Sequence, residues 1–170
     1  MAQLAVTTIG VDRPGIIAQV SKVLLDRGGN VTDSRMTILG GHFAIMLLVD
    51  VEADHDELAH ALDAETDVDL TVTVTPSGIS ATPQAPTHRV SVYATDRPGL
   101  LHGVSRALAD LGVNVTDLST QVLAGEGAVY VMLLQVELPD GVDDRDVVEA
   151  VSGRVEGVQV RAEPLEADTL

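Results

Sequence analysis

The fold is decided by one phrase that occurs twice in this chain. Residues 12–33 read DRPGIIAQVSKVLLDRGGNVTD, and residues 96–117 read DRPGLLHGVSRALADLGVNVTD. The two copies start 84 residues apart and are identical at 13 of their 22 positions. A long internal repeat in a chain of 170 residues indicates two structural units of similar size. We therefore expect a first domain over 1–76, a linker over 77–87 and a second domain over 88–165.

Hydrophobic periodicity predicts the same order of elements in both units. The first unit has helical spacing over 14–27 and 55–65, with predicted strands at 4–10, 30–39, 42–52 and 68–75. The second unit repeats this with helices at 98–110 and 144–154 and strands at 88–95, 114–123, 127–138 and 158–163. The order strand, helix, strand, strand, helix, strand predicts an α+β protein of two tandem ferredoxin-like βαββαβ sandwiches. Each would be an antiparallel sheet with both helices on one face, and its uncovered face and edges predict a homodimer.

Composition excludes several classes of function. The chain has no cysteine, so disulfides, thiolate metal sites and thiol catalysis are excluded, and its five histidines lack the spacing of a zinc site. The net charge of −16, with Lys22 as the only lysine, argues against direct nucleic-acid binding. No apolar run is long enough for a membrane span and no signal peptide is evident, so we expect a cytoplasmic protein. We also expect it to contain no cofactor and no metal.

The repeated Asp-Arg-Pro-Gly sequence lies at a strand-to-helix turn and favours anion binding. Its aspartates, Asp12 and Asp96, are expected to cap the helices, and the glycines permit close approach to the backbone. A helix start with bare amides attracts a carboxylate. Asn30 and Asn114 begin the next strand, and their amides can both donate to and accept from an amino acid. The same residue types also make an ordinary turn, so the phrase alone leaves both interpretations open.

The repeated phrase resembles the ACT domain, a small amino-acid-sensing module, and the resemblance covers nearly all of the chain outside the linker and tail. A chain of two ACT units resembles the glycine cleavage system transcriptional repressor family. This resemblance implies a non-catalytic regulator that senses a small amino acid, such as glycine or serine, where ACT units pair. It also implies action through a partner protein, either a transcription factor or a metabolic enzyme. The implied ligand-binding residues are Asp12, Arg13, Pro14, Gly15, Ile16, Ile17, Asn30, Asp96, Arg97, Pro98, Gly99, Leu100, Leu101 and Asn114.

Two alternatives remain at this stage. The chain resembles in length a regulatory subunit of an amino-acid biosynthetic enzyme, such as the small subunit of acetolactate synthase, whose second half normally lacks the repeated motif. An enzyme such as an acyl-phosphate hydrolase would need an arginine in a glycine-rich anion loop with an asparagine across from it. Arg13 and Arg97 lie within the repeated turn, but the rest of that pattern is absent. The two units differ at Ala18/His102, Gln19/Gly103 and Ser34/Leu118, so their binding sites need not be equivalent.

Overall fold

The computed structural model describes residues 2–67, 69–77, 85–124 and 127–165. The chain divides into two compact units, Met1–Ala81 and Thr82–Leu170. Most of the expected linker lies outside the described residues, as do positions 125 and 126 of the second predicted hairpin turn. Each unit is therefore considered by itself.

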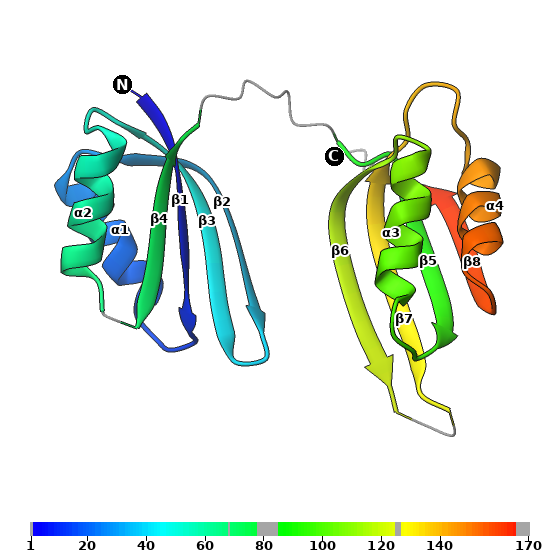
Figure 1. Ribbon diagram of the computed structural model, residues 1–170. Helices are drawn as coiled ribbons and strands as arrows, with labels where there is room; N and C mark the ends of the chain where they lie inside the picture. The colour runs from blue at the N-terminus through cyan, green and yellow to red at the C-terminus, as the bar shows by residue number, and fades with distance from the viewer. Residues whose placement is uncertain (1, 68, 78–84, 125–126, 166–170) are drawn as a thin grey trace. The chain divides into compact units, whose positions relative to one another are not determined.

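The first unit has the predicted βαββαβ order (Figure 1). Its elements are β1 (Ala2–Val11), α1 (Ile16–Asp26), β2 (Asn30–Leu39), β3 (His42–Val51), α2 (His55–Glu65) and β4 (Leu70–Pro76). The sheet order is β2-β3-β1-β4, and every pairing is antiparallel. The predicted bounds of α2 agree with the structure, because Asp54 caps its first turn by accepting from the Glu57 N–H at 2.8 Å.

The second unit repeats this architecture. Its elements are β5 (His88–Thr95), α3 (Leu100–Asp110), β6 (Asn114–Leu123), β7 (Val129–Glu137), α4 (Asp144–Arg154) and β8 (Val158–Pro164). The sheet order is β6-β7-β5-β8, again antiparallel throughout. The described helices each have 11 residues, and none has the length and apolarity to cross a membrane. The α+β class and the tandem ferredoxin-like sandwiches predicted from sequence are confirmed.

Each unit has its own aliphatic core between the sheet and its two helices. Four apolar side chains of α1 are buried in one core cluster with residues of β1 and β3: Ile16, Val20, Val23 and Leu24. In α3 the corresponding buried residues are Leu100, Val104, Ala107 and Leu108. The buried residues of α1 and α3 therefore occupy the same positions of the repeated phrase in the two units. This equivalence brings the turn that precedes each helix to the same end of its unit.

The edge strands β2 and β6 are exposed along their whole length. In β2, Ser34 and Met36 pair with Leu47 and Ile45 of β3, which are buried against the helices. Ser34 and Met36 therefore face the helix layer, although both remain exposed. The helices do not fully cover this part of the sheet, and two hollows lie there between α1 and β2.

Candidate functional site

Each Asp-Arg-Pro-Gly copy forms the turn between the first strand and the first helix of its unit. Gly15 has φ 97° and Gly99 has φ 91°, in the left-handed region that glycine enters without steric strain. These glycines occupy the N-cap positions, and no side chain caps either helix. The expectation that Asp12 and Asp96 cap the helices is therefore wrong. Their main-chain N–H groups instead donate across the sheet end at 2.9 Å, to the carbonyls of Gly41 and Ala128.

The turns leave main-chain amides at the start of each helix without helical partners. The first bond of α1 runs from the Gln19 N–H to the Gly15 carbonyl at 2.9 Å. In α3 the Gly103 N–H donates to the Gly99 carbonyl at the same distance. The amides that precede these bonds belong to Ile16, Ile17 and Ala18 in the first unit and to Leu100, Leu101 and His102 in the second. With the positive end of the helix dipole, such amides favour a carboxylate by about 0.3–1 kcal/mol when exposed.

A hollow of about 500 Å³ lies beside the first turn. It is lined by Asp12, Arg13, Pro14, Gly15, Ile16, Ile17, Ala18, Met36 and Phe43. The structure thus brings all six residues predicted from the first turn to one hollow. Three residues of the lining were not predicted from the sequence: Ala18 of α1, Met36 of β2 and Phe43 of β3. The signal for Phe43 was present, because the only phenylalanine of the chain follows the Gly40–Gly41 turn that closes this end of the sheet.

Arg13 is anchored to the protein at the rim of this hollow. Its guanidinium forms an ion pair with Asp67, in the loop between α2 and β4, and lies 3.5 Å from Gln19 Oε1. Gln19 Nε2 also donates to the Asp67 carboxylate at 2.9 Å. The hydrogen bond from Gln19, followed by the charge of Arg13, lowers the pKa of Asp67. Arg13 therefore holds the turn against the loop after α2.

Arg97 holds the second turn in a different way. Its guanidinium donates to the main-chain carbonyl of Glu156, in the loop between α4 and β8. Gly103 replaces the glutamine of the first unit, and a Cβ at that position would lie 2.7 Å from Val155 Cγ2. The close packing of α3 against the end of α4 therefore leaves no space for a side chain at position 103.

Asn30 and Asn114 lie at the opposite end of their units from the turns. Asn30 pairs with Asp50 near the end of β3, whereas the turn follows Val11, which pairs with His42 at the start of β3. Eight residues of extended strand separate these ends by about 26 Å. Within one unit, the predicted turn residues and the predicted asparagine therefore do not meet.

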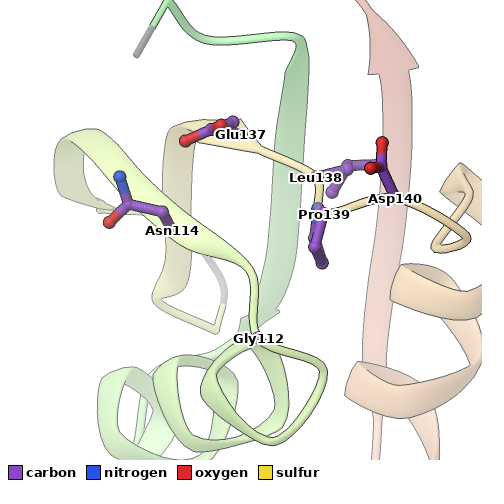
Figure 2. Close-up of a pocket in the computed structure, with 6 residues that line it drawn as sticks. All are labelled: Gly112, Asn114, Glu137, Leu138, Pro139 and Asp140. Atoms are coloured by element: carbon purple, nitrogen blue, oxygen red, sulfur yellow. The ribbon is translucent and has the colours of Figure 1, made fainter. Parts of the chain in front are cut away.

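Asn114 borders a polar hollow of about 300 Å³ in the second unit (Figure 2). The hollow is lined by Gly112, Asn114, Glu137, Leu138, Pro139 and Asp140. Asn114 pairs with Glu137 on the neighbouring strand, and Asp140 lies on the loop that follows β7. An amide and two carboxylates form surroundings that suit an ammonium group. The amides at the turn and the oxygens near Asn114 thus complement opposite ends of an amino acid.

A cluster of Asp54, His55 and Asp56 presents ligand atoms that lie within 4.8 Å of one another. Asp54 is the N-cap of α2, and Asp56 lies in its first turn, where a negative charge complements the helix dipole. His55 Nε2 is 3.3 Å from Asp56 Oδ1. Helix capping accounts for this cluster without a metal ion.

Comparison with known proteins gives the same family for both units. Residues 2–75 match a family model described as the ACT domain, and residues 88–153 match a second model with the same description. A UPF0237 protein of Methanococcus maripaludis is 41% identical over 66 residues, which are 37% of this chain and 73% of that protein.

Two further similarities extend over both units. The glycine cleavage system transcriptional repressor of Escherichia coli is 24% identical over 126 residues, which are 72% of this chain and 66% of the repressor. The crystal structure of an unknown protein from Galdieria sulphuraria is 27% identical, with a TM-score of 0.82 over 97% of this chain and 99% of that one. With the two family matches and the βαββαβ topology of each unit, these similarities show that the chain belongs to the ACT domain family and contains two ACT domains in tandem.

Proposed function

We propose that this chain is a non-catalytic, cytoplasmic regulator that binds a free small amino acid, such as glycine or serine, at its duplicated turns. The observation that carries this proposal is the set of uncapped amides at the start of α1, which border a hollow of about 500 Å³. The amides supply donors for the ligand carboxylate. The same uncapped turn recurs in the second unit, at Gly99.

The distance between the turn and the asparagine favours a site made by two copies of the chain. A zwitterion of a few ångströms cannot reach both ends of a sheet that are about 26 Å apart. We propose that it contacts a turn and an asparagine together where the turn end of a unit in one chain meets the asparagine end of a unit in a second copy of the chain. The exposed edge strands β2 and β6 offer unpaired backbone for such an association. We therefore propose a homodimer in which ligand binding and pairing of units are coupled.

The regulatory output is proposed to pass through protein contact. The relative from Escherichia coli is by name a transcriptional repressor. A chain with net charge −16 does not provide the clustered cations that phosphate contacts need. We therefore expect control of a transcription factor or a metabolic enzyme, with a coupling free energy of about 1–3 kcal/mol between ligand and partner. Co-purification with a catalytic subunit of amino-acid biosynthesis would instead favour the regulatory-subunit alternative.

Isothermal titration of the full chain against the twenty amino acids tests the proposed function. Glycine has five heavy atoms, so its affinity should not much exceed the micromolar range, at about 1.5 kcal/mol per atom. We expect saturable heat for at least one amino acid and a matching rise in melting temperature. The corresponding amino-acid amides, which lack the carboxylate, are the control and should not bind. Absence of heat and of a melting shift for every amino acid would contradict the proposal.

A further inference from the structure

A second hollow adjoins the one beside the first turn. It has a volume of about 280 Å³ and is lined by Ile17, Val20, Ser21, Val31, Ser34, Met36, Ile45 and Leu47. Ile17 and Met36 also line the hollow at the turn, so the two hollows share a wall. A ligand whose carboxylate is bound by the helix amides would therefore have this second hollow next to it.

The lining of the second hollow is apolar and uncharged. Val20, Ile45 and Leu47 are nearly fully buried, whereas Ile17, Val31 and Met36 are 48%, 41% and 47% exposed. Six lining side chains are apolar, and the other two are the hydroxyls of Ser21 and Ser34. A charged ligand side chain would find no countercharge there, whereas an aliphatic one would cover the exposed part of the lining.

The hollow is large enough for a branched side chain. Its 280 Å³ is roughly nine times the volume of about 30 Å³ that one water occupies in the liquid. That is more than the four carbon atoms of a leucine side chain require. Met36, with its flexible thioether, can change rotamer and thereby widen the passage between the two hollows.

The second unit differs at the positions that shape this hollow. Leu118 occupies the position of Ser34 and pairs with buried Leu134, as Ser34 pairs with buried Leu47. Thr120 occupies the position of Met36 and pairs with buried Met132. A leucine in place of a serine adds bulk on this face, whereas a threonine in place of a methionine removes some, so the two units have different shapes here.

We infer that the first unit also accepts an amino acid with an aliphatic side chain of valine or leucine size and binds it more tightly than glycine, with that side chain in the hollow between α1 and β2. This inference rests on the proposed function, because the amides at Gly15 must hold the carboxylate.

Titration of the full chain with glycine, alanine, valine, leucine and asparagine tests this inference. Each buried methylene should tighten binding about four-fold, so leucine should bind at least about ten-fold more tightly than alanine even when partly covered. Asparagine has as many side-chain heavy atoms as leucine and should bind no better than alanine. The variant Ser34→Leu should remove the leucine preference. Thr37→Leu, which adds similar bulk on the opposite face of β2, should keep that preference.

Several outcomes would overturn the inference. If glycine or serine binds but valine and leucine bind no more tightly than alanine, the proposed function stands and the aliphatic specificity is wrong. The same holds if Ser34→Leu keeps the leucine preference. If Ser34→Leu instead changes the mass measured by sedimentation while amino-acid binding is unaltered, a second copy of the chain covers this hollow. If no amino acid binds, the proposed function fails together with the specificity.

Discussion

The two Asp-Arg-Pro-Gly turns have the same backbone but different anchors. Both place a left-handed glycine at the N-cap and leave the following amides uncapped. In the first unit Arg13 pairs with the carboxylate of Asp67 and lies beside Gln19. In the second unit Arg97 donates to the main-chain carbonyl of Glu156. One turn is therefore held by a charge that can titrate, and the other by a neutral group.

The difference shows which features the duplication preserved. The turn and the helix start depend on residues adjacent in sequence, so both copies retain them. The anchor depends on the loop after the second helix, more than 50 residues away, where the two units have different residues. The first anchor is exposed and ionic, so it stabilises little and is screened by salt. Because the second anchor is a main-chain carbonyl that neither titrates nor changes on substitution, we still expect the first turn to respond more strongly to pH and to substitution of its anchor.

Replacing Gly103 of the second unit by glutamine, the residue at the equivalent position of the first unit, should have the largest effect on stability. In Gly103→Gln the new Cβ would lie 2.7 Å from Val155 Cγ2, so α3 and α4 must move apart. We expect a loss of about 1–3 kcal/mol in the free energy of unfolding of the second unit, measured by chemical denaturation. Gly153→Ala is the control, because its Cβ meets no atom within 4 Å and alanine should stabilise α4. An unchanged stability for Gly103→Gln would show that the packing difference between the units is not real.

Alanine at the left-handed glycines should affect both units alike. Gly15→Ala and Gly99→Ala meet no atom within 4 Å, so the loss reflects backbone strain alone. We expect about 1–2 kcal/mol of destabilisation for each, together with weaker amino-acid binding. Thermal melting and calorimetry would measure both quantities. Clearly unequal losses would contradict the equivalence of the two turns.

Removal of the ionic anchor should loosen only the first turn. Asp67→Asn removes the charge that pairs with Arg13, although Gln19 remains nearby. We expect hydrogen exchange of the amides of Ile16 to Ala18 to become a few-fold faster, with the second turn unaffected. Glu156→Gln is the matched control, because Arg97 contacts only the main-chain carbonyl of that residue. Equal acceleration in both units would contradict separate anchors.

Acid should have the smallest effect and should again distinguish the turns. Because Gln19 and Arg13 hold the pKa of Asp67 below its ordinary value of 3.8, the ionised form contributes stability in the folded state. That contribution is complete above pH 3.8 and is lost as the pH falls through the lower folded pKa. The side-chain amide signals of Gln19 in NMR spectra should shift in this range and should not do so in Asp67→Asn. A midpoint above the ordinary value would contradict the ion pair.

The elements were largely predictable because their signals are local. The predicted bounds of α2 and α4 agree with the structure, since Asp54 and Asp143 mark their starts and apolar spacing marks their faces. The internal repeat by itself predicted the tandem organisation. The six residues of the first turn are consecutive in sequence, so their convergence on one hollow needed no knowledge of tertiary structure.

The rest of the site depends on contacts between distant segments. Asp67 lies 54 residues after Arg13, and no sequence pattern links them. Met36 joins the turn only because β2 pairs with β3 in one particular register. The capping role expected of Asp12 failed because Gly15 turns the chain three residues later, which moves the N-cap away from the aspartate. Tertiary geometry decided these features.

The central claim is that uncapped amides at the duplicated turns bind the carboxylate of a free amino acid. The most direct measurement is a titration of the ¹⁵N-labelled chain with single amino acids, followed by amide chemical shifts. The account predicts saturable shifts at Ile16, Ile17 and Ala18 or at Leu100, Leu101 and His102, and their loss when the ligand carboxylate is amidated. Saturating amino acids that leave all six amides unmoved in the folded protein would contradict it.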